Sequence, residues 1–258
     1  MGPRTCGLDW WRISELKELP DEAWDQIAEM FNMVEAADKP VWPTPLTIAS
    51  VPLLVKFMGA LAPTDMRPLS ICSVLYRLWA GIRYQHLADW QDCWADPAIV
   101  GGRKGHEAIE ATWDTSADIE QALLQKLPLI GALLDYSKFF DLMVPAILWP
   151  LAIAMGCPPE IVKMVRVFNQ QLKRTFKFSR HFGPYFRSTN SIPQGCPLSM
   201  LWANLLMNVW IRLVRHHCER QALWCRISAY VDDRNIRVRT QIALANVCLL
   251  YTSPSPRD

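Results

Sequence analysis

Near the end of the sequence, residues 224–240 alternate apolar and polar side chains, and two adjacent acids, Asp232 and Asp233, interrupt the alternation. A period of two is typical of a half-buried β-strand, and two such runs around a short polar break predict a β-hairpin. The apolar positions of these runs are Ile227, Ala229, Val231, Ile236 and Val238. We therefore expect a hairpin with the acids at its tip, although neighbouring carboxylates repel each other.

A third acid ends another predicted strand. Residues 127–135, LPLIGALLD, form a short apolar run that contains Pro128 and ends on Asp135, which predicts a strand buried on both faces. If the hairpin pairs with this strand, the three carboxylates converge on one sheet. Divalent cations can neutralise such a cluster, and two Mg²⁺ ions about 3.5 to 4 Å apart assist in-line phosphoryl transfer.

Each acid also has an ordinary explanation. An Asp pair at a hairpin tip is commonly turn chemistry, because Asp accepts hydrogen bonds from nearby backbone groups and is well solvated. Asp135 alone could end a strand or cap a helix. Only the ordered set of three acids favours a metal site.

The remaining segments predict mostly helices, whose limits follow from apolar spacing, proline and glycine. The first half predicts two helices around Pro20 within residues 8–38, a Pro-rich extended passage over 39–52 that leads into a strand at 53–57, and a helix within 67–90. A glycine-rich basic loop at 101–105 precedes a helix with Ile109, Trp113, Ile119 and Leu123 at helical spacing. The second half predicts helices from Pro145 and from Pro158 to Glu160, a hairpin over 174–191 around Gly183 and Pro184, and a long apolar helix after Gln194.

Composition sets the class of protein. The 258 residues are 51% hydrophobic and 20% charged with a net charge of +2, so a large core is possible and any basic surface must be local. Eight cysteines without a CxxC pair, and no signal peptide, indicate a reducing, intracellular location. The longest apolar run, residues 142–157, is shorter than the roughly 20 residues of a membrane span and contains two prolines, so we expect a core helix and no membrane partner.

The last eleven residues, CLLYTSPSPRD, contain a Ser-Pro repeat that is unlike the apolar and basic sequence before them. They resemble a translated sequencing-library adapter. We therefore expect residues 248–258 to be foreign to the protein and the native chain to continue past Val247.

Four stretches resemble motifs of reverse transcriptases. LLDYSKFFD at 133–141, SIPQGCPLSMLWANLLMNVW at 191–210 and AYVDD at 229–233 are similar to motifs A, B and C, and RPLSICSVLYRLW at 67–79 is similar to the upstream fingers motif of non-LTR, LINE-like retrotransposon enzymes. The similarity extends over about residues 7–238. It departs from the family at Ser191, where motif B usually has Gly, and at Met200, where Pro is frequent.

The resemblance implies an α+β fold, a right-hand polymerase fragment with fingers and palm, in which helices pack on a small antiparallel palm sheet. The implied domain covers residues 1–247, with fingers at roughly 1–126 and 170–192 and palm at roughly 127–169 and 193–247. The family's thumb and upstream endonuclease are expected only in a longer polyprotein.

The resemblance also assigns roles to individual residues. Asp135, Asp232 and Asp233 would be catalytic and would hold two Mg²⁺ ions, with Mn²⁺ as a possible substitute. The nucleotide pocket would comprise Phe140 as a steric gate against a 2′-hydroxyl, Gln194, Gly195 and Arg67. Primer and template contacts would come from Tyr230, Lys173 and Arg174, although an exposed solubilising role is an equal alternative for the basic residues.

The implied function is RNA-templated DNA synthesis, in which a primer 3′-hydroxyl attacks a deoxynucleoside triphosphate and pyrophosphate leaves. The partners would be an RNA template, a DNA primer and dNTP, inside a cytoplasmic ribonucleoprotein or the nucleus. Two alternatives stay open: an RNA-dependent RNA polymerase with the same palm, and a catalytically dead or truncated remnant that only binds nucleic acid.

Overall fold

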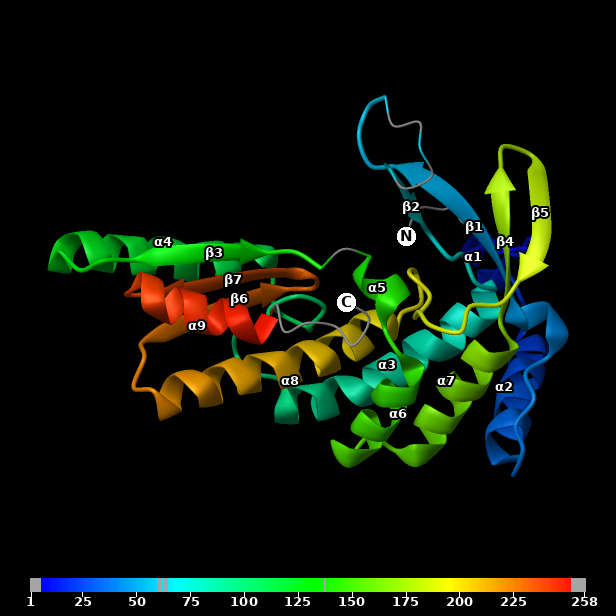
Figure 1. Ribbon diagram of the computed structural model, residues 1–258. Coiled ribbons are helices and arrows are strands. Elements are labelled where there is room, and N and C mark those ends of the chain that lie inside the picture. The colour runs from blue at the N-terminus through cyan, green and yellow to red at the C-terminus, as the bar shows by residue number, and fades with distance from the viewer. Residues whose placement is uncertain (1–5, 60–61, 63–64, 137, 252–258) are drawn as a thin grey trace. The chain divides into compact units, whose positions relative to one another are not determined.

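The computed structural model describes residues 6–59, 62, 65–136 and 138–251. The chain divides into two compact units, whose elements are labelled in Figure 1. Unit 1 comprises Met1–Leu87 and Phe140–Ser199, and unit 2 comprises Ala88–Phe139 and Met200–Asp258. These limits differ from those expected for fingers and palm, which stay a prediction.

Unit 1 contains the N-terminal helices, one sheet and the helices that follow motif A. Its elements are α1 (Ile13–Lys17), α2 (Asp21–Ala36), the 3-10 helix η1 (Thr44–Thr47), β1 (Ile48–Val55), β2 (Met66–Pro68), the first part of α3 (Val74–Trp94), α6 (Pro145–Ala154), α7 (Pro159–Gln171), β4 (Lys173–Phe178) and β5 (His181–Phe186). The short helix α5 (Phe139–Leu142) lies at the unit boundary. Prolines stand at the first position of α6 and of α7, as predicted, because the missing N–H has no helical partner there.

The sheet of unit 1 has the strand order β2-β1-β4-β5. Strands β1 and β4 are parallel, which the sequence did not predict, while the other pairs are antiparallel. The predicted hairpin β4–β5 is confirmed, but its turn lies at Ser179 and Arg180, and Gly183 and Pro184 lie inside β5. Proline is tolerated there because β5 is an edge strand and need not donate a ladder hydrogen bond from every residue.

An aromatic cluster forms the core of unit 1. The Trp42 ring meets Tyr76, Trp79 and Phe168 edge to face, with ring centroids 5.0 to 5.8 Å apart. The Trp42 indole N–H donates to the carbonyl of Met164 on α7, at 3.1 Å. This cluster joins the Pro-rich segment to α3 and α7. The extended passage expected over 39–52 is wrong in part, because Thr44–Thr47 form η1 and β1 begins at Ile48, five residues before the expected strand.

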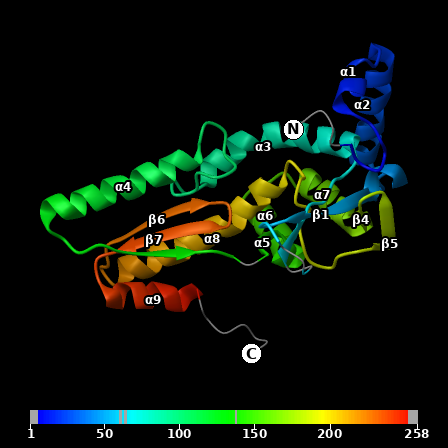
Figure 2. The same cartoon turned by 90° about the horizontal axis from the view of Figure 1, so that it is seen from above.

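Unit 2 contains the other sheet. Its elements are the last part of α3, α4 (Ala108–Gln125), β3 (Ile130–Leu134), α8 (Ser199–Arg220) from Met200 onward, β6 (Cys225–Tyr230), β7 (Asp233–Val238) and α9 (Gln241–Tyr251). The strand order is β3-β7-β6, and both pairs are antiparallel, as expected for the palm sheet. Figure 2 shows β7 between the other two strands.

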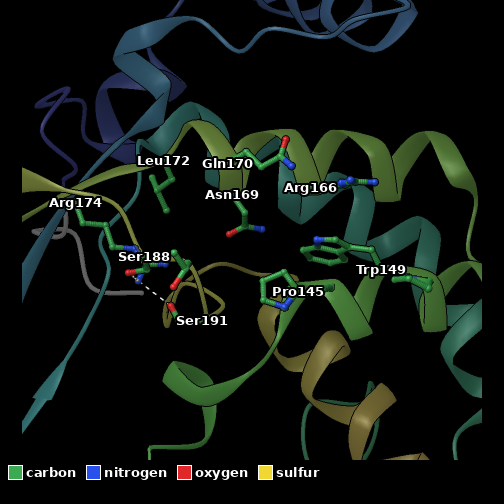
Figure 3. A pocket seen from close by; sticks show the side chains of 12 residues that line it. Pro145, Trp149, Arg166, Asn169, Gln170, Leu172, Arg174, Ser188 and Ser191 are labelled. Carbon is green, nitrogen blue, oxygen red and sulfur yellow. Dashed lines mark hydrogen bonds between the residues drawn. The ribbon is translucent and has the colours of Figure 1, made fainter.

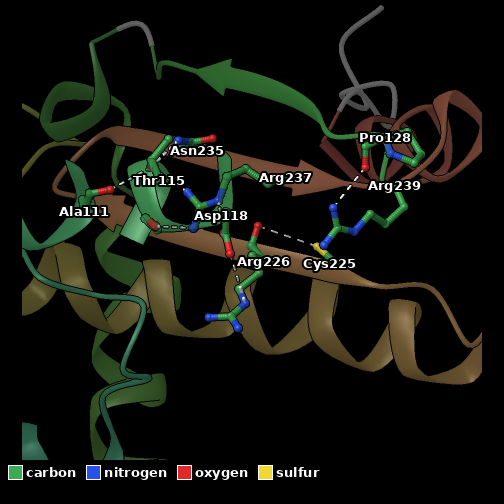
Figure 4. A network of polar contacts seen from close by, with 10 residues as sticks. Ala111, Thr115, Asp118, Pro128, Cys225, Arg226, Asn235, Arg237 and Arg239 are labelled. Atoms are coloured by element: carbon green, nitrogen blue, oxygen red, sulfur yellow. Dashed lines mark hydrogen bonds and ion pairs between the residues drawn. The ribbon is translucent and has the colours of Figure 1, made fainter. Parts of the chain in front are cut away.

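The two faces of this sheet differ in chemistry. On one face Ile227, Ala229, Ile236 and Val238 pack in a buried cluster with residues of α8 and α9. On the other face Arg237 reaches Asp118 of α4, with Nε 2.7 Å from Oδ2 (Figure 4). The predicted alternation is therefore correct at these four positions, whereas Val231, the fifth, lies in the turn and is half-buried. The polar side is partly covered by α4, which contributes a matching acid.

Two burial predictions fail. Leu133 of β3 is 85% exposed, so this strand is not buried on both faces. It is an edge strand, with Ile130 and Leu134 packed against the cluster and the other side outward. Helix α4 is present as predicted, but its regularly spaced apolar residues are exposed, because α4 turns Asp118 and Ala122 toward the unit instead.

Among the described residues, no helix is both long and apolar enough to cross a membrane. The expected foreign tail lies partly outside the described residues, at 252–258, while residues 248–251 complete α9. Its origin stays a prediction.

Candidate active site

The adjacent acids lie at the tip of hairpin β6–β7, as predicted. Tyr230, the last residue of β6, pairs with Asp233, the first residue of β7, and Val231 and Asp232 form the turn between them. Tyr230 and Asp233 are exposed, and Asp232 is half-buried. The hairpin therefore carries both carboxylates out of the apolar cluster at one end of the sheet.

The third acid is brought to the same end by strand pairing. The antiparallel register of β3 and β7 ends at the pair Leu134 and Arg234. Asp135 follows Leu134 and Asp233 precedes Arg234, so both acids lie at this end of the sheet. Asp135 is exposed. Residues almost 100 positions apart in the sequence thus share one sheet end.

The carboxylates do not form a ready metal cage. Among the described residues, no group of three or more His, Cys, Asp or Glu side chains is arranged so that it could hold a metal ion. The donor chemistry suits Mg²⁺, which prefers carboxylate oxygen and retains several waters. The structure therefore brings the three positions to one sheet end, while the ligand set of Asp135, Asp232 and Asp233 stays a prediction.

The turn of the hairpin is strained and closely supported. Val231 has φ +60°, a left-handed conformation that is unfavourable for a β-branched residue. A Cβ at Gly101 would lie 2.7 Å from the Val231 backbone nitrogen, so only glycine fits beneath the turn. Backbone strain of this kind costs about 1 to 3 kcal/mol and is found mostly at functional sites.

A segment before α4 holds this end of the hairpin. The Val100 N–H donates to the carbonyl of Ala229 at 3.0 Å, and the Ala229 N–H donates to the carbonyl of Ala98 at 2.7 Å. The side-chain amide of Asn204 on α8 donates to the carbonyl of Gly101 at 2.7 Å. The start of the predicted glycine-rich loop thus serves as a backbone support for the acidic turn.

Arg234, which sequence reasoning missed, lies directly after the acids. Its side chain is buried, with the guanidinium carbon 3.4 Å from the ring centroid of Tyr136 and 5.0 Å from that of Trp210. Because Tyr136 follows Asp135, this stacking joins the end of β3 to the start of β7 and to α8. The signal in the sequence was a basic residue at an inward-facing strand position.

The predicted nucleotide-pocket residues all belong to unit 1. Gly195 has φ +108°, and a Cβ there would lie 2.9 Å from the Ser70 carbonyl oxygen, so the motif B loop touches the segment that follows Arg67. The Ile192 N–H donates to the carbonyl of Phe140 at 3.0 Å. Arg67 is exposed, and Phe140 and Gln194 are half-buried. Within unit 1, these contacts join short stretches of motifs A and B and of the β2 region.

The two basic residues predicted to contact primer or template differ in environment. Lys173 is exposed at the start of β4, where it pairs with Ile48. Arg174 is buried and lines a pocket of unit 1 (Figure 3). Burial lowers the pKa of the Arg174 guanidinium from its ordinary value. An exposed strand-end lysine suits a phosphate contact along a surface, whereas Arg174 can act only on something that enters the pocket.

A second buried group lies beside motif B. Burial raises the pKa of the Cys196 thiol, whose sulfur lies 3.5 Å from the Tyr76 hydroxyl. The thiol therefore stays protonated at neutral pH and serves to pack the loop.

Residues 56–249 match the protein family described as reverse transcriptase (RNA-dependent DNA polymerase). The chain belongs to the reverse transcriptase family. No curated protein matches it. The four motifs found in the sequence fall within the matched residues, so the family is established over three quarters of the chain.

Solved telomerase structures share the fold of this reverse transcriptase domain. Telomerase from Candida albicans, in complex with a TWJ fragment of telomeric RNA, matches with a TM-score of 0.60 and 12% identity over 92% of this chain and 45% of that one. Apo telomerase from Candida tropicalis, truncated from the C-terminal domain, matches with a TM-score of 0.57 and 14% identity over 89% and 51%. The domain thus spans about half the length of these telomerases, and the likeness concerns the fold alone.

Motif B of this reverse transcriptase has Ser191 where the family resemblance expects Gly. Ser191 has φ +98°, a conformation that favours glycine. Its N–H donates to the carbonyl of Met143 at 2.8 Å, and its hydroxyl accepts from Arg174 at 2.7 Å. The loop therefore keeps a glycine-like backbone, and Arg174 holds the serine that occupies it.

Proposed function

We propose that this domain copies RNA into DNA, joining a deoxynucleoside triphosphate to a primer 3′-hydroxyl with release of pyrophosphate. The observation that supports the proposal is the register of β3 and β7, which ends at Leu134 and Arg234, the neighbours of Asp135 and Asp233 in the sequence. Membership of the reverse transcriptase family supports the same reaction.

In this proposal the three acids bind two Mg²⁺ ions, which when bound would neutralise charge on the attacking and leaving oxygens. Asp135 and Asp233 are exposed and Asp232 is half-buried, so solvent and ions reach this end of the sheet. The strained turn at Val231 and its support by Gly101 would fix where the acids stand. Tyr230, exposed beside Asp233, would face the primer end, and Lys173 would hold a strand by its phosphates.

Residues of unit 1 would select the substrate. Phe140 would exclude a 2′-hydroxyl, Gln194 and Gly195 would line the nucleotide, and Arg67 would bind its triphosphate. The tight fit of Gly195 against Ser70 supports a role in which backbone, not a side chain, approaches the ligand.

The proposal is tested by primer extension on an RNA template with Mg²⁺. Asp232→Asn should reduce the rate at least about a hundredfold, because metal-ion catalysis supplies several kcal/mol of transition-state stabilisation. The matched control is Asp114→Asn, an exposed acid on α4 of the same unit. Calorimetric titration with Mg²⁺ gives a second readout, in which only Asp232→Asn should weaken binding. Equal extension by both variants would refute the assignment.

An RNA-dependent RNA polymerase differs from the proposed enzyme in the sugar of the nucleotide that it incorporates. The unaltered chain should prefer deoxynucleotides, and Phe140→Ala should raise ribonucleotide incorporation relative to deoxynucleotide incorporation. A chain that prefers ribonucleotides before any substitution would be the RNA polymerase instead.

A second candidate is a nucleic-acid-binding remnant without catalysis. One observation favours it: among the described residues, the acids do not form a group that could hold a metal ion. Salt-dependent RNA binding without Mg²⁺-dependent extension would establish it.

We further propose that the domain derives from a non-LTR retrotransposon polyprotein with an endonuclease and a thumb elsewhere, acting inside the cell. Residues 67–79, which resemble the fingers motif of those elements, are the support. The gene sequence around this domain would decide.

A further inference from the structure

Unit 1 contains a pocket that no part of the proposed reaction uses. Its volume is about 470 Å³, within the size range of small-molecule sites. Helices α6 and α7, strand β4 and the segment before motif B contribute the lining, which includes Trp149, Arg166, Asn169, Arg174, Ser188 and Ser191. Figure 3 shows Arg174 and the serines on one side, Trp149 and Arg166 on the other, and Asn169 between them.

The lining carries positive charge without an acid. Arg166 and Arg174 both line the pocket, and none of the described lining residues is Asp or Glu. Arg174 is 8% exposed and takes part in none of the ion pairs among the described residues. The Nη1 atom of Arg174 donates to the hydroxyls of Ser188 and Ser191, at 3.0 and 2.7 Å. The Asp141 carboxylate, which is not part of the lining, raises the pKa of Arg174, but burial lowers it more. Because a buried cation hydrogen-bonded only to neutral oxygens is unfavourable, an anion in the pocket would stabilise the guanidinium further.

An unused acceptor lies in the same pocket. The side-chain amide of Asn169 donates through Nδ2 to the carbonyl of Val165 at 3.0 Å, which identifies the other atom as Oδ1. This oxygen is buried and accepts no hydrogen bond from the described residues. Because a phosphate oxygen is itself an acceptor, Oδ1 requires a ligand that also carries a donor, such as a hydroxyl or an amino group.

We propose that this pocket binds a nucleotide, with its phosphate on Arg174 and Arg166 and a sugar hydroxyl or base amino group on Asn169 Oδ1. The site lies wholly within unit 1 and goes beyond the proposed catalytic function, whose acids belong to unit 2. The nucleotide comes either free from solution or as one residue of a nucleic-acid strand.

The pocket is connected to motif B through one residue. Arg174 donates to Ser191, whose φ of +98° is glycine-like and which stands three residues before Gln194. A phosphate that draws the Arg174 guanidinium toward itself competes with this hydrogen bond. Occupancy of the pocket is therefore coupled to the conformation of the motif B loop.

Isothermal titration calorimetry in EDTA tests the site without metal. The unaltered chain should bind adenosine monophosphate. Arg174→Gln should weaken this affinity at least about tenfold, because charge-assisted hydrogen bonds to phosphate are stronger than neutral ones. Arg180→Gln, which removes an exposed charge from the β4–β5 turn, should leave the affinity unchanged. Asn169→Leu should weaken adenosine monophosphate but not inorganic phosphate.

A second variant guards against misfolding of Arg174→Gln. Ser188 is exposed and its hydroxyl lies 3.0 Å from Arg174, so Ser188→Glu supplies a carboxylate that occupies the phosphate position. It should keep or raise the melting temperature and abolish nucleotide binding. Arg67→Gln removes the proposed triphosphate contact and leaves this pocket intact, so loss of adenosine monophosphate binding in that variant would place the nucleotide in the proposed substrate site and overturn the proposal.

The two sources are distinguished with a short RNA oligonucleotide. If the RNA binds at least tenfold more tightly than adenosine monophosphate and loses that gain in Ser188→Glu, the ligand is part of a strand. Equal or weaker RNA binding assigns the pocket to a free nucleotide. The proposal is overturned if the unaltered chain binds no adenosine monophosphate, or if binding survives both Arg174→Gln and Ser188→Glu.

Discussion

Both units bury arginines, and Arg237 of unit 2 and Arg174 of unit 1 have different partners. In unit 2, Arg237 donates to the Asp118 carboxylate at 2.7 Å and to the hydroxyls of Thr115 and Ser228 at 2.8 and 3.0 Å. In unit 1, Arg174 donates only to serine hydroxyls and faces a pocket. The first charge has a hydrogen-bonded carboxylate, whereas the second has hydroxyl partners and an Asp141 carboxylate that raises its pKa without forming an ion pair among those of the described residues.

The difference separates structural charge from functional charge. A buried pair contributes little net stability, but removing one partner leaves an uncompensated ion in a poorly solvated place. Arg237 and Asp118 therefore fix how α4 lies on the sheet. Arg174 has no such counterpart among the described residues, and its hydroxyl partners can exchange for phosphate oxygen. Substitutions at both places should reveal this contrast.

The largest effect is expected for Asp118→Ala. It leaves Arg237 buried without a carboxylate and should lower the free energy of unfolding by about 3 to 5 kcal/mol. Urea unfolding followed by circular dichroism measures it. Asp114→Asn, on the exposed side of the same helix, is the control and should change stability by less than about 0.5 kcal/mol. A loss below about 1 kcal/mol in Asp118→Ala would mean that Arg237 reaches solvent after all.

Arg234 extends the comparison to a buried arginine beside aromatic rings. Arg234→Met keeps the length of the side chain and loses the cation–π contacts with Tyr136 and Trp210, so we expect a destabilisation of about 2 kcal/mol. The melting temperature measures it. Because the ring of Tyr136 packs on this side chain, Tyr136→Leu combined with Arg234→Met should cost less than the sum of the two single changes. Full additivity would show that the stacking carries no energy.

Ser191 provides a smaller and more specific test on the Arg174 side. Ser191→Ala removes the hydroxyl that accepts from Arg174 and keeps the strained backbone, so stability should fall by about 1.5 kcal/mol. Ser191→Gly loses the same hydrogen bond but relieves the positive φ, and should recover about 1 kcal/mol of that loss. Thermal unfolding of the two variants compares them. If Gly is no better than Ala, the strain at this position is negligible.

Much of the fold could be predicted because local chemistry agrees with the final structure. Prolines mark where α6 and α7 begin, and the period of two before and after the acids gives hairpin β6–β7 with its core face correct. The order of motifs A, B and C identified the family. These signals depend only on residues close together in the sequence.

The failures concern partners that are distant in sequence. Leu133 belongs to an apolar run, but whether such a strand is central or at an edge depends on what pairs with it, which its own residues do not tell. Helix α4 buries a side that its own apolar spacing does not predict. Asp118 on that side pairs with Arg237, which is more than 100 positions away in the sequence. The pocket residue Asn169 carries no local signal of its environment, and Arg234 has only its inward-facing strand position, which does not reveal the aromatic rings around it.

The smallest effect is expected at Arg226, which approaches the same carboxylate from the surface. Its Nε lies 3.7 Å from Asp118 Oδ1, and its side chain is 57% exposed. Because solvent screens this pair, Arg226→Gln should change the free energy of unfolding by no more than about 0.5 kcal/mol, in contrast to the loss of Asp118 itself. Urea unfolding at low and at high salt measures both variants. A loss at low salt above about 1 kcal/mol would mean that Asp118 needs two cations, and that Arg237 alone does not balance it.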